Sequence, residues 1–119
     1  MNSFGRIFTV QIFGESHGVG AGIVIDGCPA GVPINEDLFE PDMARRRAGA
    51  KGTTPRKEAD LPELMSGTFN GKTTGAPITI FFKNMNTRSG DYANLVKSPR
   101  PGHADFTGRI KFGGYNDYR

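Results

Sequence analysis

One stretch near the N-terminus, Phe13 to Gly18, constrains this chain more than any other. It reads Phe-Gly-Glu-Ser-His-Gly, so that a carboxylate, a hydroxyl and an imidazole occupy three consecutive positions. The apolar run Ile7 to Phe13 leads into it, and the glycine-rich run Gly18 to Gly22 leads out. Because glycine adopts backbone conformations that other residues resist, the pattern predicts a strand end that exposes a reactive trio in a tight turn.

Glycine content also bears on the fold as a whole. The 119 residues include 17 glycines, about twice the share expected from a typical usage of roughly 7%. With 36% hydrophobic and 23% charged residues, the sequence predicts one domain with many turns and a modest core that needs further sequence or partners to close. The net charge of +3 suits an anionic small molecule at least as well as nucleic acid.

Cysteine usage and hydropathy point to a cellular setting. The single cysteine, Cys28, excludes an internal disulfide and a cysteine-rich metal site. The longest apolar runs, Ile23–Ile25 and Ile78–Phe82, fall far short of the roughly 20 residues that span a bilayer. No secretory signal pattern opens the chain. The sequence therefore predicts a soluble, cytoplasmic protein.

Hydrophobic alternation and turn signals predict four strands, over residues 4–14, 21–26, 64–69 and 77–83. The first two strands would pair through Gly14–Gly22, with the reactive trio at the tip. Asn70-Gly71 is typical of a hairpin turn.

Two helices are predicted, near residues 36–47 and 103–112. Asn35 can cap the first helix, and Pro41 should kink or restart it. We expect apolar side chains of both helices to pack: Leu38, Phe39 and Met43 in the first, Phe106, Ile110 and Phe112 in the second.

Three short motifs resemble known functional motifs, but their spacing or the neighbouring sequence argues against each. Gly14 to Gly18 matches G-x-S-x-G, but a serine nucleophile elbow needs a helix next, and here another β-like run follows. Gly67 to Thr73 has one residue too few between its glycines for a P-loop. Gly18 to Gly22 lacks the third glycine of the dinucleotide fingerprint. These last glycines indicate close approach of another strand or of a ligand.

The chain has two histidines, His17 and His103, and both lie in glycine-bounded turns. Imidazole titrates near neutrality, so either histidine could act as a general acid or base. Each could equally serve only to bond its own turn. Asp105 could orient the His103 ring. Two histidines without a third clear ligand are weak evidence for a metal, and no metal is expected.

Arg45-Arg46-Arg47 places three guanidinium groups at the end of the first predicted helix. Arginine is well suited to bind phosphate or carboxylate through two hydrogen bonds. Consecutive residues point in different directions around a helix, so one or two of the three would face a given pocket. A solvated basic helix end is the plainer interpretation. The nearby Lys51, Arg56 and Lys57 favour anion binding, although a non-catalytic phosphate- or nucleic-acid-binding module stays open as an alternative.

These motifs, taken in order, closely resemble the N-terminal part of the chorismate synthase family. The similarity covers nearly the whole chain, and several motifs in register are far more specific than any one of them. The matching segments are Phe13-Gly14-Glu15-Ser16-His17-Gly18, Asp26-Gly27-Cys28-Pro29-Ala30-Gly31, Arg45-Arg46-Arg47, Thr53-Thr54-Pro55-Arg56, Ser66-Gly67, Thr73-Thr74-Gly75-Ala76-Pro77-Ile78, Asp91-Tyr92 and Arg100-Pro101-Gly102-His103-Ala104-Asp105.

The resemblance implies a lyase of the shikimate pathway that converts 5-enolpyruvylshikimate 3-phosphate to chorismate by 1,4-elimination of phosphate and that requires reduced FMN. NADPH is a candidate reductant for the flavin. His17, beside the phosphate, and His103, beside the flavin, would be catalytic. Ser16, Arg46 and Arg47 would bind the substrate, while Arg46, Lys51 and His103 would contact the flavin.

The resemblance further implies an α/β fold of the α+β type, in which antiparallel sheets sandwich helices in β-α-β layers, and a homotetramer. There are departures, because Ala48 stands where the family usually has proline, and members run to about three times this length. We therefore expect residues 1–119 to be the N-terminal part of a single, truncated chorismate synthase domain. Alone, it should have little or no activity.

Overall fold

The computed structural model describes residues 2–15, 18–46, 61–84 and 98–115. These residues form both strands and helices. The elements in chain order are β1 (Ser3–Gly5), β2 (Thr9–Gly14), β3 (Gly20–Asp26), the 3-10 helix η1 (Glu36–Phe39), α1 (Glu40–Arg46), β4 (Glu63–Ser66), β5 (Thr68–Phe69), β6 (Lys72–Thr73), β7 (Ile78–Lys83) and α2 (Asp105–Lys111).

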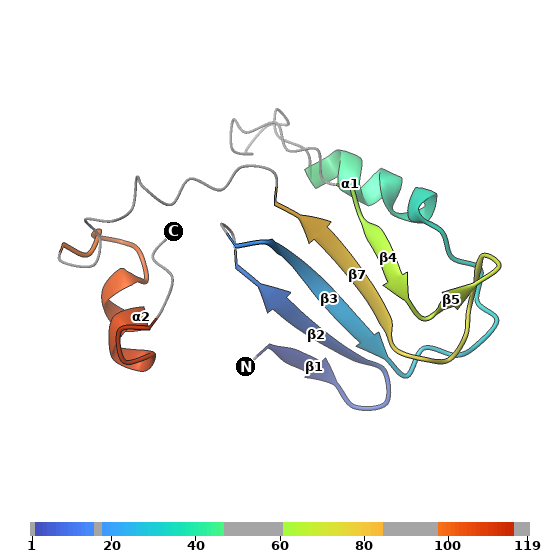
Figure 1. Ribbon diagram of the computed structural model, residues 1–119, viewed down its shortest axis with the longest axis horizontal. Coiled ribbons are helices and arrows are strands. Elements are labelled where there is room, and N and C mark those ends of the chain that lie inside the picture. The colour runs from blue at the N-terminus through green and yellow to red at the C-terminus, as the bar shows by residue number, and fades with distance from the viewer. Residues whose placement is uncertain (1, 16–17, 47–60, 85–97, 116–119) are drawn as a thin grey trace.

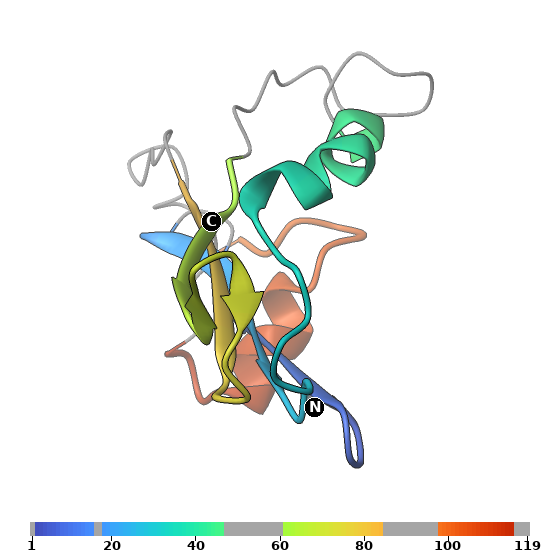
Figure 2. The same cartoon turned by 90° about the vertical axis from the view of Figure 1, so that its right-hand side faces the viewer.

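Five strands form one antiparallel sheet in the order β1-β2-β3-β7-β4 (Figure 1). The predicted pairing of the first two long strands is confirmed, with Phe13 opposite Gly22 and Gly14 opposite Ala21. Strand β7 joins the other side of β3, so a segment about 60 residues further along the chain lies directly beside the glycine-rich strand. Figure 2 views the sheet nearly edge-on and shows η1 and α1 to one side of it.

The strand predicted over residues 4–14 is two strands, β1 and β2, which pair with each other. Gly5 has φ of +91°, in the region that only glycine enters readily, and the chain reverses there. Ile7 at the tip of this reversal is 90% exposed. The prediction of one continuous strand was wrong, because an apolar run looks the same in sequence whether it continues a strand or forms the tip of a hairpin.

One face of the sheet is apolar across three strands. Residues directly opposite each other in antiparallel strands share a face. Ile78 and Ile80 of β7, only 2% and 4% exposed, are the buried hydrophobic side chains of this face. The two rows that cross it are Val10, Ile25 and Ile78, then Ile12, Ile23 and Ile80.

Gly20 and Gly22 of β3 allow the close approach that was expected of this glycine run. A Cβ on Gly22 would lie 2.7 Å from the Phe13 ring and 2.5 Å from a backbone oxygen of β7, and one on Gly20 would strike the Phe81 ring. The rings of Phe13 and Phe81 are nearly parallel, at 10°, with centroids 6.4 Å apart. The groups that approach these two glycines are therefore the backbone of strand β7 and the aromatic rings of Phe13 and Phe81.

The first predicted helix is present as η1 followed by α1. The Asn35 side chain accepts a hydrogen bond from Leu38 N at 3.2 Å, which confirms the predicted cap. Helix α1 begins one residue before Pro41, which confirms the restart, since proline fits the first turn of a helix. Met43 is buried, but Leu38 is 60% exposed, so its predicted packing was wrong.

The second predicted helix is also present, as α2. Its apolar side chains were expected to pack, yet Phe106, Ile110 and Phe112 are 60%, 67% and 54% exposed. Periodicity indicates a helix, but it does not supply the surface against which the helix packs.

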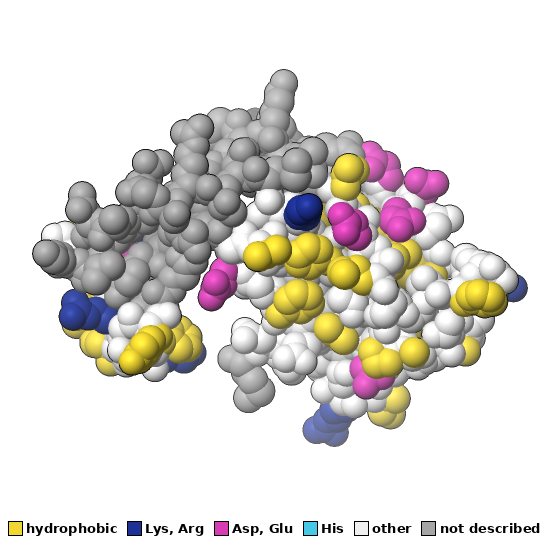
Figure 3. All heavy atoms as spheres, in the orientation of Figure 1, with side chains coloured by type: hydrophobic (Ala, Val, Ile, Leu, Met, Phe, Trp, Pro, Cys, Tyr) yellow, Lys and Arg dark blue, Asp and Glu magenta, His cyan; other side chains and the backbone are white. Residues whose placement is uncertain are grey.

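Buried hydrophobic side chains are few in the described part of the chain: Met43, Ile78 and Ile80. Figure 3 shows hydrophobic side chains gathered over the sheet on the face turned to the viewer. This agrees with a glycine-rich chain that does not close a large core. None of the helices in the described ranges has the length and apolar character needed to cross a membrane.

Candidate functional site

The connection from β2 to β3 carries the reactive trio of the sequence. Gly14 closes β2 with φ of +102°, and a side chain there would collide with the carbonyl oxygen of Gly20. The Gly18 amide donates to the Glu15 carbonyl oxygen at 3.1 Å, which closes a tight turn. Ser16 and His17 themselves lie outside the described residues.

Asn84, just after β7, anchors both sides of this turn. Its side-chain amide nitrogen donates to the Glu15 carbonyl at 3.0 Å and to the Gly18 carbonyl at 2.9 Å. Its backbone amide donates to the Val19 carbonyl at 3.0 Å. The sequence did not indicate a role for Asn84, because its side-chain hydrogen bonds join residues 66 to 69 positions apart and no local sequence pattern predicts them.

The structural context agrees with the rejection of two motifs. The chain passes from strand β2 to strand β3, whereas a nucleophile elbow joins a strand to a helix. Asn70 and Gly71 have φ of +48° and +73° between β5 and β6, as a type I′ hairpin turn requires. The segment that resembles a P-loop is therefore this small hairpin.

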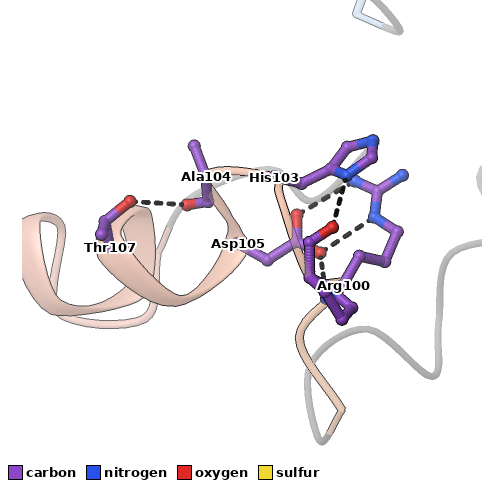
Figure 4. Close-up of polar contacts among 6 residues, drawn as sticks. Arg100, His103, Ala104, Asp105 and Thr107 are labelled. Atoms are coloured by element: carbon purple, nitrogen blue, oxygen red, sulfur yellow. Dashed lines mark hydrogen bonds and ion pairs between the residues drawn. The ribbon is translucent and has the colours of Figure 1, made fainter.

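The turn before α2 presents His103 and is closed by an ion pair (Figure 4). The Asp105 carboxylate accepts hydrogen bonds from Arg100 N and Nε at 2.9 Å and from Arg100 Nη2 at 3.0 Å. Gly102 within the turn has φ of +74°. Figure 4 shows the His103 ring and the Arg100 guanidinium projecting to the same side of the turn.

Asp105 is 5% exposed, yet the structure favours its charged form. The hydrogen bond from the Arg100 side chain, followed by that from the Arg100 backbone, lowers the pKa of Asp105 from 3.8 to about 2 and outweighs the effect of desolvation. The prediction that Asp105 orients the His103 ring was wrong in its direct form. Among the described residues, all three hydrogen bonds to its carboxylate come from Arg100, since the guanidinium fork matches a carboxylate far better than a ring nitrogen does.

The His103 ring is oriented instead by the backbone of its own turn. Nδ1 lies 3.3 Å from the Pro101 carbonyl oxygen. A carbonyl oxygen can only accept, so Nδ1 carries the hydrogen in this contact. Nε2 is then the nitrogen with which neutral His103 accepts a proton, and from which its protonated form donates one.

Arginines end helix α1, as predicted. Arg45 pairs with Asp42 one turn earlier, and both side chains are exposed. Arg46 is the last residue of α1 and is exposed. Arg47 and Lys51 lie outside the described residues. The convergence of His17 and His103 with these cations on one pocket therefore stays a prediction.

Comparison with known proteins covers nearly the whole chain. The family model described as chorismate synthase matches residues 8–119. The chain is 64% identical to the chorismate synthase of Chitinophaga pinensis over 119 residues, covering all of this chain and 36% of that protein. It is 51% identical to the chorismate synthase of Methanocaldococcus jannaschii, covering all of this chain and 32% of that protein.

A solved structure supports the same assignment at the level of the fold. A crystal structure of chorismate synthase superimposes with a TM-score of 0.60 and 31% identity, over 91% of this chain and 25% of that one. The expected α+β fold with antiparallel sheets is confirmed. The chain spans about a third of the length of the curated relatives it matches. Because the family model matches residues 8–119 and the solved structure matches 91% of the chain, this chain belongs to the chorismate synthase family.

Proposed function

We propose that this chain takes part in chorismate synthase activity, the elimination of phosphate and one ring proton from 5-enolpyruvylshikimate 3-phosphate to give chorismate. The observation on which this rests is the family match from residue 8 to residue 119. It includes both histidine-bearing turns, Gly14 to Gly18 and Arg100 to Asp105. Residues 1–119 would form part of a single chorismate synthase domain.

His17 is the proposed acid at the departing phosphate. A phosphate that leaves carbon develops negative charge, and a positioned imidazolium that donates a proton typically gains about 10²–10⁴-fold in rate. Asn84 bonds the carbonyls of Glu15 and Gly18, the described residues that flank Ser16 and His17, and this anchoring of the turn supports the proposal. Ser16 would then be a hydrogen-bonding neighbour of the substrate rather than a nucleophile.

Arg46 and Arg47 are the proposed anion-binding groups. A guanidinium stabilises phosphate oxygens through two parallel hydrogen bonds, and it keeps its charge at any pH at which the protein is folded. Arg46 is exposed at the end of α1, as expected of a residue that binds a ligand from solution. Both groups would stabilise the charge that forms on the leaving phosphate.

His103, Arg46 and Lys51 are the proposed contacts for FMN. The donor set fits this group chemically, because cationic side chains suit its phosphate and an imidazole with a fixed tautomer suits a polar edge of its ring. The Pro101 contact that leaves Nε2 of His103 for proton exchange is the structural support for this fit. Reduced FMN, when bound, supplies the electron-rich ring that the family requires for this redox-neutral elimination, and NADPH is the proposed reductant.

The proposal extends to the setting of the protein. The partner is a small phosphorylated molecule rather than nucleic acid or a membrane. The protein is a lyase that assembles as a homotetramer in the cytoplasm. Sedimentation velocity on the protein that carries this segment would test the assembly.

A hybrid protein tests the function directly. The 119-residue chain would replace the matching 36% of the Chitinophaga pinensis relative, and chorismate formation would be followed anaerobically with reduced FMN. The proposal expects turnover within about tenfold of the intact relative's, given 64% identity in the exchanged part, and little or none from the 119-residue chain alone. A folded, soluble hybrid without turnover would contradict the proposal.

A further inference from the structure

Asp105 lies where the turn carrying His103 meets helix α2. It is the first residue of α2, and its carboxylate bonds back to Arg100, five positions earlier, through one backbone and two side-chain donors. The Arg100 carbonyl in turn accepts a hydrogen bond from the His103 amide at 3.4 Å. His103 is therefore enclosed within a loop that the two residues close.

We propose that Asp105 is a positioning residue for His103, which acts by clamping Arg100 to the start of α2 and so fixing the turn from Arg100 to Asp105. The inference rests on the proposed catalytic role of His103. The Asp105 carboxylate is occupied by its hydrogen bonds to Arg100. In this proposal Asp105 therefore acts through the turn and touches neither substrate nor flavin.

The geometry of the clamp explains why aspartate stands at this position. Two carboxylate oxygens accept three donors, of which two come from the planar guanidinium fork. Asparagine has one acceptor oxygen and would bring its NH₂ group against an Arg100 donor. Because the carboxylate is 5% exposed, water cannot readily replace the lost bonds.

The clamp also explains how a turn with little packing holds its shape. The neighbouring apolar residues Phe106 and Ile110 are exposed, so apolar burial contributes little here. Gly102 takes φ of +74°, a conformation that makes the reversal possible but does not enforce it. The ring bond from His103 Nδ1 to the Pro101 carbonyl lies inside the same loop and depends on its shape.

The test is the ring signal of His103 in the hybrid protein, labelled with ¹³C at histidine and assigned by its loss in His103→Ala. Asp105→Asn and Arg100→Lys are compared with wild type, and Asp42→Asn is the matched control because it removes an exposed Arg–Asp pair in α1. We expect both turn variants to shift and broaden the His103 peak, while Asp42→Asn leaves it unchanged. A His103 peak that superimposes on wild type in both turn variants would overturn the proposal.

Methyl signals of Ile78 and Ile80 report whether the sheet is intact, because both side chains are buried in it. If Asp105→Asn also disturbs these methyl signals, the decision falls to Arg100→Lys, which keeps the charge and loses only the bidentate fork. A double variant carrying both changes should show no more displacement of the ring than either single one, since both remove the same clamp. Additive displacements would count against it.

Turnover of the hybrid protein separates this inference from the proposed function. A misplacement of about 1 Å can cost about 10²-fold in rate, so Asp105→Asn should lower kcat about 10- to 100-fold and change KM for the substrate much less. Full turnover in Asp105→Asn but not in His103→Ala would overturn the clamp alone. Full turnover in His103→Ala would overturn the role of His103, whereas the ring signal would still decide whether Asp105 fixes it.

Discussion

The side-chain amide of Asn84 donates to the Gly18 carbonyl at 2.9 Å, across 66 positions of sequence. The same nitrogen donates to the Glu15 carbonyl at 3.0 Å, so one side chain ties both sides of the turn that carries Ser16 and His17. Strand β7 pairs with β3, and this pairing brings Asn84 to the turn. The sheet therefore supplies an anchor for the β2–β3 turn, in which His17 is the proposed acid.

Asn84→Ala should destabilise the chain by about 1–3 kcal/mol, because a typical hydrogen bond contributes about 0.5–1.5 kcal/mol and at least two are lost. Asn84→Asp is the sharper comparison, since it keeps the shape and turns an acceptor oxygen toward two carbonyls. We expect it to destabilise at least as much as alanine in urea unfolding. Equal stability of wild type and both variants would contradict the anchoring role.

Gly22→Ala should destabilise the sheet by about 1–3 kcal/mol, the usual cost of overpacking. The added methyl would meet the Phe13 ring at 2.7 Å and the Ile80 carbonyl oxygen at 2.5 Å. Gly18→Ala is the matched control, because the nearest atom there lies at 3.6 Å. Thermal unfolding followed by circular dichroism compares the two, and a Gly22→Ala variant as stable as Gly18→Ala would contradict the close packing.

Asn35→Ala should lower stability by about 1 kcal/mol through loss of the helix cap. Its side-chain oxygen accepts from Leu38 N at the start of the helical segment that ends at Arg46. Asn35→Asp keeps an acceptor at the same place and should restore most of the loss. If aspartate proves no better than alanine in urea unfolding, the cap contributes nothing measurable.

Acid should weaken the turn before α2. The Arg100 side chain, and then its backbone amide, lowers the pKa of Asp105 from 3.8 to about 2. Between these values the unfolded chain binds more protons than the folded one, so the contribution of Asp105 is complete above about pH 5 and is lost as pH falls toward about 2. The stability difference between wild type and Asp105→Asn should shrink through that window. A difference independent of pH from about 5 to about 2 would contradict the shift.

Local signals in the sequence were sufficient for much of the fold. Asn70-Gly71 needs positive φ at both positions, and the structure has it. The Asn35 cap and the restart at Pro41 depend only on residues within one helical turn. The glycines after the reactive trio were interpreted as sites of close approach, and two of them, Gly20 and Gly22, lie against aromatic rings of neighbouring strands.

The remaining features depend on residues that sequence proximity does not connect. Asn84 meets the β2–β3 turn only because β7 pairs with β3. By its position in the sequence, Asp105 could bond either His103 or Arg100. It bonds Arg100, because the planar guanidinium offers two donors to the two carboxylate oxygens. Phe106 and Ile110 have helical spacing, yet nothing in the periodicity reveals whether a surface covers them.

His17 and His103 are proposed to serve one elimination site. The most direct test is anaerobic chorismate formation by the hybrid protein carrying His17→Ala, His103→Ala or both, with Glu63→Gln on the exposed β4 strand as a control. We predict that each single change lowers kcat by about 10²–10⁴-fold, and that the double variant falls well short of the product of the two losses, as expected for groups that act as a unit. Wild-type turnover in both single variants would contradict the account.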